Sequence, residues 1–90
     1  MLTYQQRIIW ADDEVEFLQP HKLFLEKRDF EVVTVNSGED AIESIKNNNY
    51  DLLLIDEMMT GIDGLTTIKK LRELNVDIPI IMITKNEEEW

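Results

Sequence analysis

Four short apolar runs alternate along the chain with stretches whose apolar positions repeat at helical spacing. The runs occupy residues 8–11, 30–35, 52–55 and 78–83. Three of them are almost continuously apolar and rich in β-branched residues, which is typical of strands covered on both faces of a parallel sheet. The run at 30–35 mixes polar and apolar positions, as an edge strand does. The pattern therefore predicts four strands.

The first predicted helix covers residues 15–28 and carries an apolar face at i, i+3/i+4 and i+7 spacing. The residues on this face are Phe17, Leu18, His21, Phe24 and Leu25. Pro20 lies within the first two turns, so it either kinks the helix or marks its N1 position. We expect the whole face to turn toward the sheet, with His21 as a helix-face residue rather than a ligand.

The second predicted helix covers residues 39–47, with Ile42 and Ile45 turned toward the sheet. Ser37, followed three residues later by Asp40, is a capping-box signal at its start. The three asparagines that follow at residues 47–49 favour a turn between this helix and the next strand.

The third predicted helix covers residues 64–74 and is capped by Asp63. Its inward positions are Leu65, Ile68 and Leu71. Residues 85–90 have the pattern of the start of a fourth helix. The alternation of strands and helices predicts right-handed crossovers, and therefore one parallel α/β sheet in a single domain over residues 1–90.

The composition narrows the classes of partner. The 19 acidic and 9 basic residues give a formal net charge of −10, which repels phosphate backbones and argues against direct binding of nucleic acid. The same charge suits a cation or a basic protein surface. Cysteine is absent, which excludes disulfides and thiolate metal sites, and no apolar run is long enough to cross a membrane. Because the first residues carry no secretory signal, we expect a cytoplasmic domain that does not bind membranes.

Acidic and hydroxyl side chains follow three of the predicted strands. They are Asp12 and Asp13 after the first strand, Asp56 after the third and Thr84 after the fourth. Ligands of open parallel sheets bind beyond the carboxyl ends of the strands, so we expect these side chains to converge. Carboxylates so close together repel one another unless they are protonated or share a cation. Oxygen ligands without His or Cys favour a hard ion, best Mg²⁺, and the whole set is suited to phosphoryl transfer onto a carboxylate.

Four short motifs stand in register along the chain. They are Trp-Ala-Asp-Asp-Glu at 10–14, Leu-Leu-Ile-Asp at 53–56, Gly-Ile-Asp-Gly at 61–64 and Pro-Ile-Ile-Met-Ile-Thr at 79–84. Together they resemble the receiver domain of two-component response regulators over essentially the whole chain. The resemblance implies a flavodoxin-like, doubly wound parallel sheet of order 2-1-3-4-5. The fifth strand and last helix of that fold find no counterpart in these 90 residues, so we expect a receiver domain that is incomplete at its C-terminus.

The resemblance implies a role for each matching residue. Asp56 would be the phosphoacceptor. Asp13 and Asp56 would ligate Mg²⁺ directly, Asp12 mostly through a water, and Met58 through its backbone carbonyl. Thr84 would be the switch hydroxyl that moves toward the phosphoryl group.

The implied function is a signalling switch rather than an enzyme. A sensor histidine kinase or phosphotransfer protein would phosphorylate Asp56, and the effector domain would lie outside this chain. Phosphatases of the haloacid-dehalogenase type also form an aspartyl phosphate, but they need a carboxylate where Met58 stands. A pseudo-receiver or assembly module, folded but not phosphorylated, is the alternative for this chain. The motif at 10–14 and residues 82–89 further resemble PorX-type regulators, which join a receiver to a PglZ, alkaline-phosphatase-like domain.

The chain departs from the family pattern in three places. Thr60 stands where the family usually has proline, so we expect a changed loop rather than a lost site. Lys85 stands where a small residue is usual, and we expect it to be a solvated side chain that alters phosphodonor access. The family's lysine at the end of strand five has no counterpart, so phosphotransfer should be poor. Without that strand, residues 78–83 would form an open apolar edge, through which we expect the chain to associate with itself.

Overall fold

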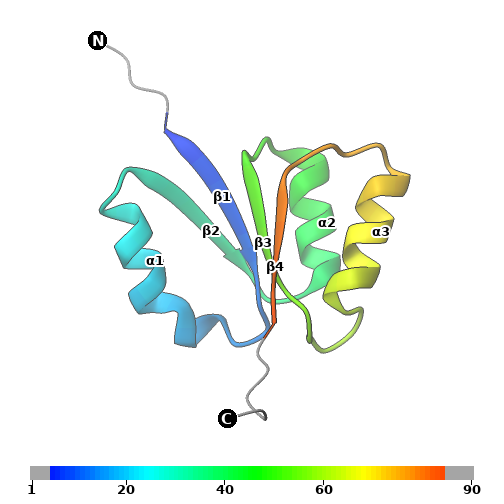
Figure 1. Cartoon of the computed structure of the whole chain (residues 1–90), viewed down its shortest axis with the longest axis horizontal. Coiled ribbons are helices and arrows are strands. Elements are labelled where there is room, and N and C mark those ends of the chain that lie inside the picture. The colour runs from blue at the N-terminus through cyan, green and yellow to red at the C-terminus, as the bar shows by residue number, and fades with distance from the viewer. Residues whose placement is uncertain (1–4, 85–90) are drawn as a thin grey trace.

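The computed structural model describes residues 5–84, which form one four-stranded sheet with helices on both faces (Figure 1). The elements in chain order are β1 (Gln6–Ala11), the 3₁₀ turn η1 (Val15–Leu18), α1 (Gln19–Glu26), β2 (Phe30–Val35), α2 (Gly38–Asn47), β3 (Leu52–Asp56), α3 (Gly64–Glu73) and β4 (Ile80–Ile83). All neighbouring strands are parallel, in the order β2-β1-β3-β4. The predicted α/β class and strand order are confirmed for these four strands, with β2 at an edge as expected. The helix start predicted at 85–90 lies outside the described residues.

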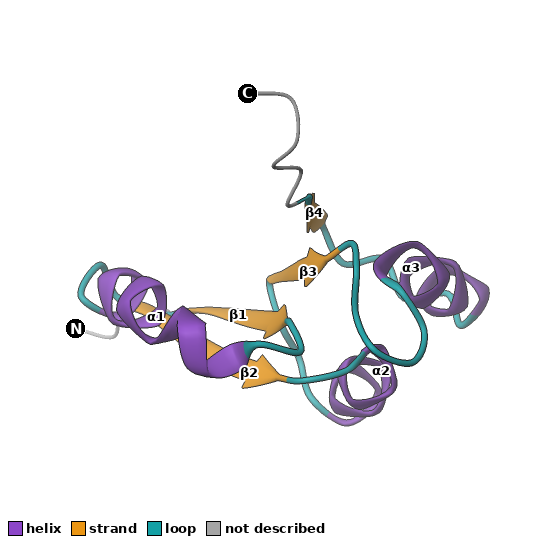
Figure 2. Ribbon diagram, turned by 90° about the horizontal axis from the view of Figure 1, so that it is seen from below, coloured by secondary structure: helices purple, strands orange, loops and turns teal. Residues whose placement is uncertain are grey.

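Alternate residues of each strand enter two separate apolar clusters, because α1 covers one face of the sheet and α2 and α3 cover the other (Figure 2). The cluster beneath α1 is built from Ile8, Trp10, Leu18 and Val32. The larger cluster, beneath α2 and α3, is built from Ile9, Ala11, Ala41, Ile45, Leu53, Ile55, Leu71 and Ile78. The central strands β1 and β3 are thus buried on both faces, as their near-continuous apolar runs predict. The same prediction is wrong for β4, where Ile81 and Met82 are exposed.

The predicted inward face of the first helix is wrong in three of its five positions. Leu18 is buried and Leu25 packs partly against the cluster beneath α1, but the side chains of Phe17 and Phe24 are 70% and 54% exposed. His21 is also exposed, with its ring centroid 6.3 Å from that of Trp10. The outward ring of Phe24 is instead covered by the guanidinium of Arg28, 3.8 Å from the ring centroid.

Pro20 accounts for the break in the predicted helix, which places Phe17 in a separate turn from His21 and Phe24. It lies in the first turn of α1 and has no N–H to donate to the preceding turn. Residues 15–18 consequently form a 3₁₀ turn with three residues per turn, and the α-helix begins only at Gln19. A single 3.6-residue period drawn through both segments therefore combines positions that do not share a face.

The other two helices begin where their caps predict. The Ser37 hydroxyl accepts a hydrogen bond from the Asp40 N–H (3.0 Å) at the start of α2, and the Asp63 carboxylate accepts one from the Thr66 N–H (2.8 Å) at the start of α3. Ile45 of α2 is buried in the larger apolar cluster, as expected, and Ile42 packs partly against that cluster.

The predicted inward position of Leu65 is wrong, since its side chain is exposed while Thr67 is fully buried. The Thr67 hydroxyl donates to the Asp63 carbonyl (2.8 Å), so its polarity is satisfied inside the helix. Thr67 also packs so closely on Gly38 of α2 that a Cβ at that position would collide with its hydroxyl oxygen. Gly64, Thr67 and Leu71 thus form the buried face of α3 at i, i+3 and i+7 spacing, and Leu65 lies off this face.

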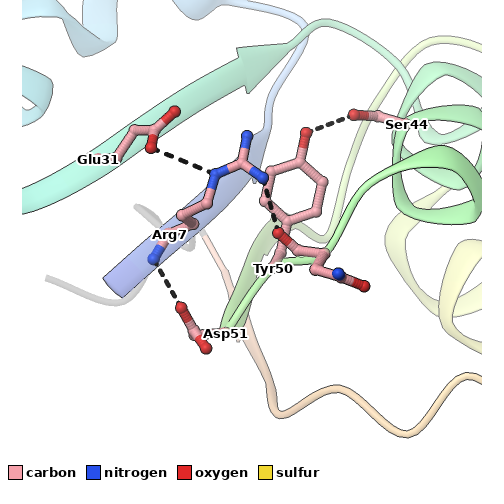
Figure 3. A network of polar contacts seen from close by, with 6 residues as sticks. Arg7, Glu31, Ser44, Tyr50 and Asp51 are labelled. Atoms are coloured by element: carbon pink, nitrogen blue, oxygen red, sulfur yellow. Dashed lines mark hydrogen bonds and ion pairs between the residues drawn. The ribbon is translucent and has the colours of Figure 1, made fainter. Parts of the chain in front are cut away.

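Arg7 joins the starts of β1, β2 and β3 (Figure 3). These amino ends of the strands lie at the opposite end of the sheet from Asp12, which follows β1. Its Nε pairs with the Glu31 carboxylate (3.2 Å), its Nη1 donates to the Asn49 carbonyl (2.9 Å), and its guanidinium lies 4.8 Å from the centroid of the Tyr50 ring. The backbone N–H of Arg7 donates to the Asp51 carboxylate (2.7 Å). The turn between α2 and β3 is thereby fixed to the start of β1.

Replacing Arg7 with methionine should lower the free energy of unfolding by about 1 to 2 kcal/mol, because a hydrogen bond, an ion pair and a cation–π contact are lost together. Urea unfolding followed by circular dichroism measures the change. The matched control is Arg28→Met, which removes one exposed cation–π contact and should cost less than about 0.5 kcal/mol. Equal losses in the two variants would contradict a clamping role for Arg7.

Candidate functional site

The pairing of β1 with β3 places two carboxylates side by side at the carboxyl edge of the sheet. Ala11 pairs with Ile55 in the parallel register, and both side chains are fully buried. The next residue of each strand is an aspartate, Asp12 after β1 and Asp56 at the end of β3. This edge is the lower one in Figure 1, where the loops after β1 and β3 emerge.

Asp12, Asp13 and Asp56 form one cluster, in which each contributes a carboxylate oxygen within 4.8 Å of the others. Asp12 is only 1% exposed and Asp56 only 3% exposed, while Asp13 is partly exposed. The structure thus brings together the three carboxylates that the sequence predicts. Charges of one sign that are this close and this deeply buried repel one another strongly, and a cation would relieve that repulsion. An all-oxygen donor set of this kind fits a hard ion such as Mg²⁺.

Backbone N–H groups orient the two buried carboxylates. The Glu14 N–H donates to Asp12 Oδ1 (2.9 Å), and the Met58 N–H donates to Asp56 Oδ1 (3.3 Å). The backbone of Met58 therefore lies against the Asp56 carboxylate, while its side chain points into solvent. The predicted role concerns the Met58 carbonyl instead of its N–H, and it stays a prediction.

Thr60 holds the third carboxylate. Its backbone N–H and its hydroxyl both donate to Asp13 Oδ2, at 2.9 and 3.0 Å. The two residues are 47 positions apart, so this contact ties the loop after β3 to the loop after β1. The sequence marks Thr60 as a departure from the family pattern, but it gives no sign of this contact.

Gly64 allows α3 to begin directly against Asp56. A Cβ at this position would lie 2.6 Å from the Asp56 carbonyl oxygen, a backbone atom that cannot move aside. The Gly64 N–H donates to the Glu57 carbonyl (2.9 Å) and closes the loop of residues 57–63. Gly61 within the loop has φ +86°, the left-handed region that favours glycine. The Gly-Ile-Asp-Gly motif therefore sets the shape of the loop beside the carboxylates.

Asp63 belongs to the helix start rather than to the carboxylate cluster. The pKa of its carboxyl lies below the ordinary value, chiefly because the Thr66 N–H donates to it and secondarily because the Thr66 side chain does so too. The charged form thus caps the positive end of the α3 dipole.

Thr84 directly follows the strand that neighbours Asp56. Asp56 pairs with Ile83 in the β3–β4 register, and the Glu57 N–H donates to the Ile83 carbonyl (2.9 Å). The register therefore places Thr84 at the same edge of the sheet as the cluster, with an exposed side chain. Its role as a switch hydroxyl stays a prediction. Lys85, also named as a departure, lies outside the described residues.

Residues 8–90 match the family of response regulator receiver domains. Among curated proteins, ResD of Bacillus subtilis is 34% identical over 87 residues, which are 97% of this chain and 36% of that protein. SrrA of Staphylococcus aureus is 38% identical over 82 residues, or 91% of this chain and 34% of that protein. Both are named transcriptional regulatory proteins. The chain spans about a third of the length of these relatives.

Two solved structures show the same arrangement of elements. The receiver domain of the Francisella response regulator 1452 superposes with a TM-score of 0.85 at 29% identity, over 94% of this chain and 70% of that one. TrrA of Thermotoga maritima, described as a complex with Mg²⁺-BeF, superposes with a TM-score of 0.83 at 32% identity, over 92% and 72% of the two chains. None of the helices in the described part of this chain has the length and apolar character that spanning a bilayer requires.

Proposed function

This chain belongs to the family of response regulator receiver domains, and we propose on that premise that Asp56 is its phosphate-accepting residue. The carboxylate cluster of Asp12, Asp13 and Asp56 is the single observation that carries this proposal, because it offers both a nucleophile and a cation site at one edge of the sheet. Receiver domains are regulatory phosphoacceptor domains, not enzymes in themselves. The phosphodonor would be a sensor histidine kinase or a phosphotransfer protein.

In the proposed reaction the Asp56 carboxylate attacks the phosphorus of a phosphohistidine. An O–P bond forms, the P–N bond of the donor breaks, and its electron pair leaves with the imidazole. Mg²⁺, when bound, would neutralise charge on the phosphoryl oxygens. Asp12, Asp13 and Asp56 would hold the ion together with the Met58 carbonyl, and the Thr84 hydroxyl would donate to a phosphoryl oxygen.

In the proposed function, the effector domain that produces the output lies outside this chain. The matched relatives are named transcriptional regulatory proteins, and each is about three times as long as the chain. The resemblance to PorX-type regulators with a PglZ domain stays a prediction, as does a cytoplasmic location. The competing function is a pseudo-receiver, and the phosphorylation experiment below separates the two.

Asp13→Asn should weaken Mg²⁺ binding at least about tenfold, because one charge-assisted ligand is lost from the cluster. The fluorescence of Trp10, which is buried in β1 two residues before Asp12, can report the titration. Asp63→Asn is the matched control, since Asp63 caps α3 outside the cluster and asparagine preserves the cap. Equal Mg²⁺ affinity in the parent chain and Asp13→Asn would refute the metal site.

Asp56 should be the residue that carries an acyl phosphate after incubation with Mg²⁺ and a small phosphodonor such as acetyl phosphate. Borohydride trapping followed by mass spectrometry locates the label. A chain extended through the expected fifth strand should label readily, and the 90-residue chain much more slowly for want of the family's lysine. Label on Asp12 or Asp13, or label that persists in Asp56→Asn, would contradict the assignment. No label at all in the extended chain would favour the pseudo-receiver.

Association through β4 is the proposed behaviour of the 90-residue chain. Within the described residues β4 pairs with β3 alone, and its Ile81 side chain is 53% exposed. An unpaired edge with apolar side chains invites pairing with a second copy. Light scattering at micromolar concentration should show a dimer or larger species, and a chain extended through strand five should be monomeric.

The edge itself can be tested by Ile81→Lys, which should shift the 90-residue chain toward monomer because a charged edge disfavours strand pairing. Leu65→Lys is the matched control, since Leu65 is also an exposed apolar residue but lies on α3 away from the edge. A parent chain that scatters as a stable monomer would overturn this proposal.

A further inference from the structure

We propose that Thr60 is a positioning residue for the cation site: it orients the carboxylate of Asp13 toward the ion. This inference rests on the proposed Mg²⁺ function of the cluster. Thr60 itself offers no ligand in this proposal. It acts through Asp13, whose Oδ2 it holds with two hydrogen bonds.

The two donors act on a single oxygen. The Thr60 N–H and hydroxyl approach Asp13 Oδ2 at 2.9 and 3.0 Å, and both bonds are charge-assisted because the acceptor is a carboxylate. Two bonds from one residue fix the plane of the carboxylate as well as its position. Both Thr60 donors contact Oδ2, and Asp13 contributes one carboxylate oxygen to the cluster, within 4.8 Å of those of Asp12 and Asp56. A ligating carboxylate that is hydrogen-bonded in this way is a common arrangement around protein-bound metals.

Asp13 needs such support more than its two neighbours do. Asp12 and Asp56 are almost fully buried and stand directly at the ends of paired strands, whereas Asp13 is partly exposed and one residue beyond Asp12. A partly exposed side chain in a loop loses more rotamer freedom when it binds an ion, unless it is already held in place. Thr60 supplies that preorganisation from a different loop.

The side chain at position 60 determines how many donors reach Asp13. Serine keeps both the N–H and a hydroxyl, valine keeps the N–H and the shape of threonine, and proline has neither donor. The three substitutions therefore form a graded series that removes none, one or both of the hydrogen bonds.

The affinity for Mg²⁺ should depend on the hydroxyl donor when magnesium chloride is titrated into the 90-residue chain by isothermal titration calorimetry. We expect Thr60→Ser to match the parent and Thr60→Val, which lacks the hydroxyl donor, to bind Mg²⁺ about three- to tenfold more weakly. If the two hydrogen bonds instead hold Asp13 away from the ion, Thr60→Val and Thr60→Pro would bind more tightly. That result would overturn the proposal.

Three controls separate positioning from a structural role. Thermal unfolding without Mg²⁺ should be nearly the same for the parent, Thr60→Ser and Thr60→Val, so that a loss of affinity in Thr60→Val is not a loss of fold. Thr66→Val removes a hydroxyl that serves Asp63 instead of the cluster, and its Mg²⁺ affinity should equal that of the parent. In an Asp13→Ala background Thr60→Val should have no further effect, because the carboxylate that it positions is gone.

The same titrations distinguish failure of the inference from failure of the proposed function. No Mg²⁺ binding by the parent chain, or an unchanged affinity in Asp13→Ala, would refute the cation site and the inference with it. If Asp13→Ala weakens Mg²⁺ binding while Thr60→Val and Thr60→Pro keep the affinity of the parent, only the role of Thr60 is refuted. An effect of Thr60→Val that persists in the Asp13→Ala background would also refute it.

Discussion

The parallel register between β1 and β3 is the constraint on which the rest of the site depends. A slip of one residue would turn every side chain of a strand to the opposite face, and this sheet buries both faces in different clusters. Ile9 and Ile55 are fully buried on the α2–α3 side, so the apolar packing itself fixes the alignment. Asp12 and Asp56 are adjacent as a consequence. The carboxylate cluster is therefore a product of core packing, not of any attraction between its members, which repel one another.

That repulsion explains why the surroundings of the cluster are rich in N–H donors. Glu14 and Met58 donate backbone hydrogen bonds to the two buried aspartates, and Thr60 donates two to Asp13. Each donor makes a hydrogen bond to a carboxylate oxygen and fixes its position. Most of these donors belong to the tight loop after β3, and Gly64 allows that loop to close directly on the Asp56 carbonyl.

The sequence predicted the strands and the carboxylate cluster because each depends on a strong local signal, whereas the sheet order followed from the family resemblance. Continuous β-branched runs have few alternatives to buried parallel strands, and strand ends must meet at one edge. The inward faces of helices were less predictable. The first helix is divided into a 3₁₀ turn and an α-helix, and the buried face of α3 runs through Thr67, which packs on Gly38 of another helix, instead of through Leu65. Such contacts between distant elements leave no local signal.

Thr60 belongs to the same class of contact, because its partner is 47 residues away and the side chain is exposed. Positions of this kind can change the behaviour of a site while the fold stays the same, since no core packing depends on them. Asp12 and Asp56 lack that freedom, because their positions follow from the buried residues before them. The cluster thus combines two carboxylates fixed by the sheet with one carboxylate held by a loop side chain.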